Sequence, residues 1–119
     1  MLDKNNAYFK KEYYDICTGD KSYTEGHRKA WIAWDNSLHD GLDEIEMNDF
    51  LWEREVVGFC EALRAAGYTS FTYTNQSTAV MENIHAFAAA GCTMVGLATI
   101  TKTNIWGETK NSLGIRFTL

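Results

Sequence analysis

The 119-residue sequence predicts an α+β fold, in which three N-terminal helices are followed by a β-α-β-β unit. Apolar residues recur with a helical period of about 3.6 before Gly67, whereas β-branched and aromatic residues dominate the segments after it. The hydrophobic fraction of 45% is enough for one core, and domains typically have roughly 100–150 residues. We therefore expect a single domain over residues 1–119, with a helical part to about residue 67 and a β-α-β-β part over about 68–119.

The first helix is predicted over residues 5–17. Its apolar face begins at Phe9 and continues at helical spacing toward the break at Gly19. Either Asn5 or Asn6 can cap its N-terminus, because asparagine side chains accept hydrogen bonds from the free backbone N–H groups there.

The second helix is predicted over residues 24–39. Trp31 and Trp34 lie one turn apart and give it a large apolar surface, since each can bury on the order of 200 Å². Gly41 follows directly and is expected to end the helix in a left-handed conformation.

The third helical segment is predicted within residues 43–66. Asp43-x-x-Glu46 resembles a capping box at its start, and Gly67 ends it. Asn48 could instead begin a second helix after a break, so the pattern leaves open whether this segment is one helix or two.

The C-terminal part alternates strand and helix patterns and predicts a three-stranded mixed sheet. The first two strands are expected to be parallel through a right-handed crossover, and the last two to form an antiparallel hairpin. Helices must then cover at least one face of the sheet, giving two layers. The predicted elements are a strand at 68–73, a helix from the polar run at 75–78 to Gly91, a strand at 92–101, a loop at 104–111 and a strand at 113–119.

Acidic side chains are concentrated in residues 35–61, which contain nine acids and one base and therefore carry a net charge of −8. Residues 1–34 carry +1 and residues 62–119 carry +2, so this predicted helical block accounts for the chain's −5. One interpretation is a solvated helix face. The other, on which our functional hypothesis rests, is a surface that docks onto a basic region of another protein.

The predicted partner-binding residues form what we call the acidic patch. Two aromatic residues lie among its acids, and aromatic anchors dominate the energies of many interfaces. The patch consists of Asp40, Asp43, Glu44, Glu46, Asp49, Phe50, Trp52 and Glu53. The expected partner is a protein with a basic surface, such as a host nuclease. Direct binding to nucleic acid is not expected because of the acid excess, and no apolar run is long enough to span a membrane.

Two weaker hypotheses concern other chemistry. The polar run that follows the first predicted strand could bind a small ligand or substrate at a helix start, although helix capping explains it equally well. This run comprises Thr74, Asn75, Gln76, Ser77 and Thr78. Glu82-x-x-His85 has the spacing of a di-iron ligand pair, but the chain has no second copy of it. We therefore expect no catalytic residue, metal or cofactor, and retain a structural homo-oligomer as a third alternative.

The three cysteines, Cys17, Cys60 and Cys92, lack the close spacing of zinc ligands and the even number of a disulfide scaffold. Cys60 and Cys92 fall in apolar segments and are expected to be small buried residues. This pattern favours a protein of the reducing cytoplasm.

The C-terminal half also resembles a known group of proteins. The residues that carry the resemblance are Gly67 to Tyr73, Gln76-Ser-Thr-Ala-Val-Met-Glu, Gly91-Cys-Thr-Met-Val-Gly-Leu and the final Gly-Ile-Arg-Phe. They resemble small uncharacterised accessory proteins of phages and other mobile elements, and the resemblance carries over no catalytic residue. It implies a role in modulating host defence, and in general style the chain resembles anti-CRISPR inhibitors.

Overall fold

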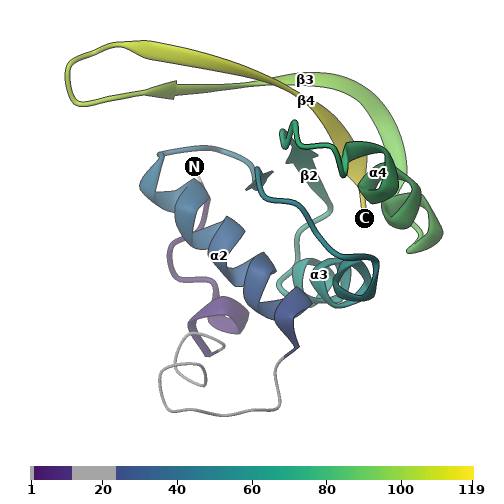
Figure 1. The fold of residues 1–119 in the computed structure, drawn as a ribbon. Coiled ribbons are helices and arrows are strands. Elements are labelled where there is room, and N and C mark those ends of the chain that lie inside the picture. Colours follow the sequence, from purple (N-terminus) through teal and green to yellow (C-terminus); the bar gives the residue numbers. More distant parts are fainter. Residues whose placement is uncertain (1, 12–23) are drawn as a thin grey trace.

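The computed structural model describes residues 2–11 and 24–119 (Figure 1). Its helices and strands follow each other in the order of an α+β fold, which confirms the predicted class. Residues 7–11 are helical, and the labelled elements that follow are α2 (Glu25–His39), β1 (Glu46–Met47), α3 (Glu53–Ala65), β2 (Ser70–Tyr73), α4 (Val80–Ala89), β3 (Thr93–Thr103) and β4 (Thr109–Thr118).

The sheet has four strands in the order β1-β2-β4-β3, so the prediction of three strands is wrong. The additional strand is β1, which pairs in parallel with β2. Its ladder is made by the carbonyl oxygens of Ile45 and Met47, which accept hydrogen bonds from Thr72 N–H at 2.9 Å and Thr74 N–H at 3.0 Å. A strand of two residues is too short to give an alternating pattern, and the sequence therefore gave no sign of it.

The antiparallel hairpin and the shared direction of β2 and β3 agree with the prediction, whereas the pairing of β2 with β4 was not predicted. Both β2 and β3 are antiparallel to β4, so they run in the same direction, with β4 inserted between them. The hairpin of β3 and β4 is longer than expected because its strands extend to Thr103 and from Thr109. The loop predicted over residues 104–111 is correspondingly reduced to residues 104–108.

The first helix begins at an expected cap, and the second begins where it was predicted to begin. The Asn6 side chain accepts a hydrogen bond from Phe9 N–H at 3.1 Å, while residues 12–17 of the predicted first helix, Cys17 included, lie outside the described residues. Thr24 caps α2 by accepting from His27 N–H at 3.3 Å. Gly41 follows the end of α2 with a φ of +69°, which confirms the predicted left-handed terminator.

The third helix starts ten residues later than the prediction from Asp43. Residues 43–52 contain β1 and loops, so Asp43 and Glu46 form no capping box, and α3 is a single helix from Glu53. The capping contact at the start of α3 comes instead from Glu55, whose carboxylate accepts a hydrogen bond from Trp52 N–H at 2.9 Å. The acidic segment 35–61 is therefore helical only at its two ends, and the prediction of a helical block is wrong.

An aromatic cluster joins the sheet to α3 and α4. The Phe71 ring of β2 lies 5.3 Å from Phe59 of α3, 5.0 Å from Phe87 of α4 and 5.5 Å from Phe117 of β4, measured between ring centroids. All four side chains are buried. Helix α2 packs on α3 at Gly26, where an added Cβ would lie only 2.2 Å from the carbonyl oxygen of Glu55.

The β3–β4 hairpin arches over the rest of the chain, and its turn projects beyond the body (Figure 1). A bulge between Met94 and Gly96 lies near its base, and bulges bend a strand and increase its twist. Farther along the hairpin, Lys102 of β3 reaches back to Glu46 of β1, with Nζ 2.5 Å from the carboxylate oxygen. This ion pair joins β1 and β3, the two outer strands of the sheet. The sheet therefore curls toward the face that carries Lys102 and Glu46.

Candidate interaction groove

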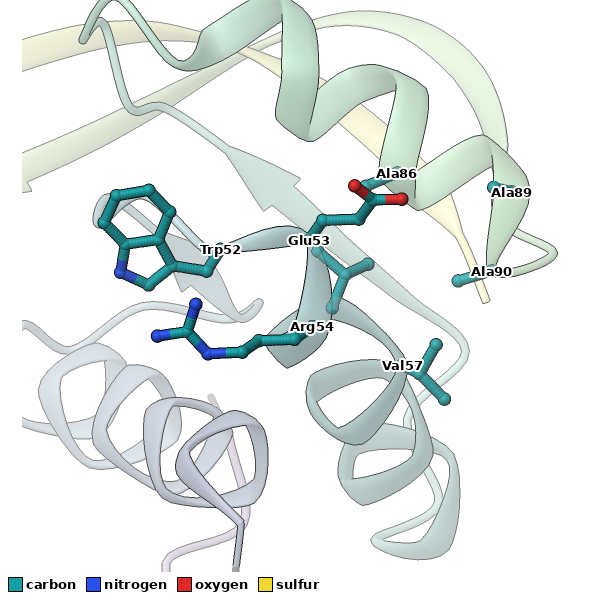
Figure 2. A pocket seen from close by; sticks show the side chains of 8 residues that line it. Trp52, Glu53, Arg54, Val57, Ala86, Ala89 and Ala90 are labelled. Atoms are coloured by element: carbon teal, nitrogen blue, oxygen red, sulfur yellow. The ribbon is translucent and has the colours of Figure 1, made fainter.

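A groove of about 570 Å³ lies between α3 and α4 (Figure 2). Trp52 and Arg54 project from the start of α3, whereas Glu53 points toward Ala86 of α4. The groove exists because α4 presents small side chains to α3 along this surface. We call it the α3–α4 groove, and its lining consists of Trp52, Glu53, Arg54, Val56, Val57, Ala86, Ala89 and Ala90.

A second hollow, of about 540 Å³, adjoins the first. Trp52 and Glu53 line both, so Trp52 stands on the boundary between them, and 53% of the surface of this residue is exposed. The second hollow also includes the start of α4, where Glu82 is exposed. The remaining residues that line it are Phe50, Leu51, Ser77, Thr78, Ala79 and Asn83.

The segment before Trp52 is held in place by Asn83 of α4, a buried side chain. The Asn83 amide oxygen accepts a hydrogen bond from Leu51 N–H at 2.9 Å, and its NH₂ group donates to the Leu51 carbonyl. The same amide oxygen accepts from the Tyr73 hydroxyl at 2.6 Å. Burial raises the pKa of Tyr73 to about 12, so this hydroxyl keeps its proton at neutral pH. The sequence analysis missed Asn83, whose partners are distant along the chain.

Lys29 of α2 fixes the other side of the segment. Its ammonium lies 2.9 Å from the Glu55 carboxylate, donates to the Phe50 carbonyl at 3.0 Å and stands 4.8 Å from the centre of the Phe50 ring. Burial raises the pKa of Glu55, but hydrogen bonds from Lys29 and Trp52 N–H outweigh it, and the net pKa is below the ordinary value.

The two aromatic residues of the acidic patch pack against each other. Phe50 and Trp52 meet edge to face, with ring centroids 5.4 Å apart, and the Arg54 guanidinium lies 5.5 Å from the centre of the Trp52 ring. An exposed indole fixed by an aromatic neighbour and a guanidinium loses little freedom on binding, so Trp52 is preorganised to act as an anchor.

The structure divides the acidic patch in two. Phe50, Trp52 and Glu53 lie together at the hollows, and Asp49 is next to them, exposed and 4.0 Å from the Lys29 ammonium. Asp40, which is exposed, lies instead at the hairpin, 3.4 Å from the Lys102 ammonium.

Asp43 and Glu44 precede β1 and Glu46 lies in it, and the carboxylates of Glu44 and Glu46 bind basic residues of the hairpin. The Glu44 carboxylate binds Arg116 at 2.7 Å and accepts a hydrogen bond from the Thr72 hydroxyl. Glu46 is buried, binds Lys102 and accepts from the Thr74 hydroxyl at 2.7 Å. Asp43 is exposed. Three of the nine acids in residues 35–61, Asp40, Glu44 and Glu46, thus pair with basic residues of the hairpin and join it to the body.

The polar run at residues 74–78 precedes α4, which begins at Val80 and not at residue 75 as predicted. Asn75 accepts from Ser77 N–H at 3.0 Å and donates to the Asn48 carbonyl at 2.9 Å. Ser77 accepts from Ala79 N–H at 3.3 Å. Asn75 and Ser77 thus bond backbone groups, whereas Ser77 and Thr78 also line the second hollow, and the ligand-binding alternative stays a prediction.

The histidine of α4 and the two described cysteines lie in different surroundings. His85 and Glu82 are exposed on α4, and no group of three or more potential metal ligands comes together within residues 2–11 and 24–119. Cys60 and Cys92 are buried, as predicted, and their sulfur atoms lie 3.5 Å apart, a contact that their spacing of 32 residues did not reveal.

The sequence analysis also missed the exposed end of the hairpin. Ile105 and Trp106 form the turn between β3 and β4, and 89% and 79% of their side-chain surface is exposed. Two large apolar residues in a predicted loop were the available signal, but we interpreted residues 104–111 only as a connection.

None of the described helices combines the length and the apolar character needed to cross a membrane. Comparison with curated proteins gives no match, and comparison with solved structures gives none either. A family model matches residues 29–119, a range that contains the α3–α4 groove and the whole hairpin. The chain therefore belongs to the family described as a domain of unknown function, DUF7698.

Proposed function

We propose that the chain is a non-enzymatic protein-binding module, in which Trp52 and the two hollows beside it receive a basic surface of a partner protein. The observation that carries this proposal is the indole itself. It is more than half exposed, it is fixed by Phe50 and Arg54, and it stands between two hollows large enough to accept side chains. Tryptophan in such a setting is typical of interface hot spots.

Charge defines the kind of partner. Glu53 and Glu82 are exposed acids that line the hollows beside Trp52, and Asp49 is exposed next to Phe50, whereas Arg54 is the basic residue that lines the α3–α4 groove. A partner with lysine or arginine side chains around an apolar residue complements this surface, and charge complementarity favours both specificity and rapid association. Fewer acids can contact a partner than the sequence suggested, because Glu44, Glu46 and Glu55 pair with basic residues of the same chain.

The more specific role is inhibition. A basic surface that accepts carboxylates is the same surface with which a nuclease binds phosphates, so an acidic module seated there excludes nucleic acid. The resemblance of the C-terminal half to accessory proteins of phages and mobile elements supports this choice. We therefore propose an anti-CRISPR-type inhibitor of a host nuclease or a related nucleic-acid-binding protein, acting in the cytoplasm.

The test begins with capture of partners by the tagged full-length chain from its native host, followed by binding measurements on each purified partner. We expect Trp52→Ala to weaken binding by about 30-fold or more, the effect of losing a hot-spot residue. Glu53→Lys should also weaken binding, because it reverses an exposed charge. The loss of affinity should be larger at low salt than at high salt, since salt screens exposed charges.

Glu61→Lys provides the matched control, since Glu61 is an exposed acid on α3 away from both hollows. It should bind nearly as well as the unchanged chain. The inhibitor role further requires that the chain compete with nucleic acid for the captured partner. The proposal is overturned if Trp52→Ala and Glu53→Lys bind as tightly as the control, or if the partner's contact surface is acidic.

A further inference from the structure

The outer edge of the sheet is formed by β3, a strand of eleven residues. It pairs with β4 on one side, and on its other side no described strand lies next to it. The opposite outer strand, β1, has two residues. Long edge strands present a row of backbone N–H and C=O groups that can pair with another chain.

This edge lacks the usual devices that prevent such pairing. Residues 93–101 contain neither a charged residue nor a proline. Lys102 follows them, but its ammonium turns inward to Glu46 and Asp40 and does not guard the edge. The bulge between Met94 and Gly96 disturbs the base of the strand and leaves the regular ladder from Leu97 to Thr103 intact.

Exposed apolar side chains lie at both ends of the hairpin. Met94, Val95 and Leu97 are exposed at its base, with Leu97 at 73%, whereas Ile105 and Trp106 are exposed at its tip. The two groups are separated by about ten residues, or roughly 33 Å of extended chain. Apolar surface of this kind on a monomer marks a site of association.

We propose that two copies of this chain pair antiparallel through their β3 edges, about a two-fold axis at Thr99. In that register Leu97 of one copy lies opposite Thr101 of the other, and Thr103 lies opposite the bulge at Val95. Beyond the bulge, the turn with Ile105 and Trp106 lies beside the apolar base of the partner hairpin. The two four-stranded sheets become one continuous sheet.

Several features favour a second copy over an unrelated strand. Only an antiparallel copy brings the tip of one hairpin against the base of the other on both sides of the axis. The edge carries no charge, so identical strands meet without repulsion of like charges. Five exposed apolar side chains from each copy, at roughly 100 Å² each, supply about 1,000 Å², the size at which a specific interface begins.

The first measurement is sedimentation velocity of the full chain from about 1 μM to about 100 μM, the range in which weak self-association is detected. We expect a species of twice the 13.5 kDa monomer mass that grows with concentration. Thr99→Lys places a charge at the axis and should abolish it, whereas Thr109→Lys, on the exposed part of β4, should not. Circular dichroism shows that each variant is folded. Trp106→Ser should weaken dimerisation by about tenfold or more.

The register is tested by cross-linking. Thr99→Cys places two thiols directly opposite each other across the axis, close enough for a disulfide, and Thr103→Cys places its thiol opposite Val95. Diamide takes up the two electrons and two protons that the thiols release. We expect a covalent dimer for Thr99→Cys and none for Thr103→Cys or the unchanged chain.

The proposal is overturned by a chain that stays monomeric at the highest concentration, by Thr99→Lys dimers as stable as the unchanged ones, or by cross-linking of both cysteine variants to the same extent. Since the α3–α4 groove plays no part in this interface, none of these results bears on the binding function proposed above.

Discussion

Four phenylalanines, from α3, β2, α4 and the base of β4, meet in the body with their rings buried, whereas farther along the β3–β4 hairpin Leu97, Ile105 and Trp106 are exposed to solvent. In the body, each ring position is determined by packing against the others. In the hairpin, the backbone ladder between β3 and β4 holds the strands together whatever the exposed side chains are. The side chains packed in the body are therefore constrained by stability. The exposed side chains of the hairpin are not constrained in this way and are free to take part in association.

The hairpin is nevertheless joined to the body by a few particular contacts. Phe117 at its base belongs to the aromatic cluster, and Ile100 is buried farther along β3. Lys102 binds Glu46 and Asp40, and Arg116 binds Glu44. Changes at the ion pairs of Lys102 and Arg116 should loosen the arch without unfolding the body, which distinguishes them from changes in the core.

The largest effect is expected from Phe87→Ala, which opens a cavity where α4 meets the sheet. Phe87 touches Phe59, Phe71, Tyr73 and Phe117, so we expect the free energy of unfolding to fall by about 3–5 kcal/mol. Urea denaturation followed by circular dichroism measures it.

Trp106→Ala is the control for this prediction, because it removes an aromatic residue of the hairpin that is mostly exposed. Measured at low protein concentration, it should change the free energy of unfolding by less than about 0.5 kcal/mol. Equal losses for Phe87→Ala and Trp106→Ala would show that the body and the hairpin do not differ in the way we describe.

A smaller effect is expected from Asn83→Ala, which acts where the body supports the binding surface. The change leaves Leu51 N–H, the Leu51 carbonyl and the Tyr73 hydroxyl without their buried partner, at a cost of about 1–3 kcal/mol. Hydrogen exchange at the Leu51 amide should accelerate beyond what the global loss of stability explains. Asn111→Ala, an exposed change on the hairpin, should leave the Leu51 amide unchanged, and acceleration in both variants would contradict the assignment.

The features that the sequence predicted correctly are local. Thr24 and Gly41 delimit α2 because a cap and a terminator act within a few residues of themselves. The hairpin follows from two β-rich segments close together in the chain. The apolar positions of Cys60 and Phe87 follow from the helical period, which reports the buried face of each helix.

The features that the sequence did not predict depend on distant partners. Glu44 and Glu46 resemble the acids of a first helical turn, but they bind Arg116 and Lys102 on the hairpin. The pattern around Asp43 therefore suggested a helix where the chain forms β1 and loops. The exposure of Trp52 was equally invisible, since an aromatic residue at helical spacing can be buried or exposed. The exposure of Trp52 distinguishes a residue that packs in the core from one that can serve as an anchor for a partner.

The smallest effect is expected at Lys102, whose ion pairs join the hairpin to the body. Burial lowers the pKa of Lys102, but the carboxylates of Glu46 and Asp40 outweigh burial and raise it above its ordinary value. A group whose pKa is higher in the folded state contributes stability below its unfolded pKa, about 10.4, and loses that contribution as the pH rises through the folded pKa.

We therefore expect Lys102→Met to lower the free energy of unfolding by about 1 kcal/mol at pH 7, with Glu46→Gln adding little to it in a double-mutant cycle. The difference between the unchanged chain and Lys102→Met should shrink above pH 10.4, and taking this difference cancels the ionisation of tyrosines common to both. Lys110→Met is the matched control, since Lys110 is exposed on the same hairpin and should give no difference at either pH. A Lys102→Met difference that stays constant with pH would mean that Lys102 stabilises the fold through the packing of its hydrocarbon stem and not through its charge.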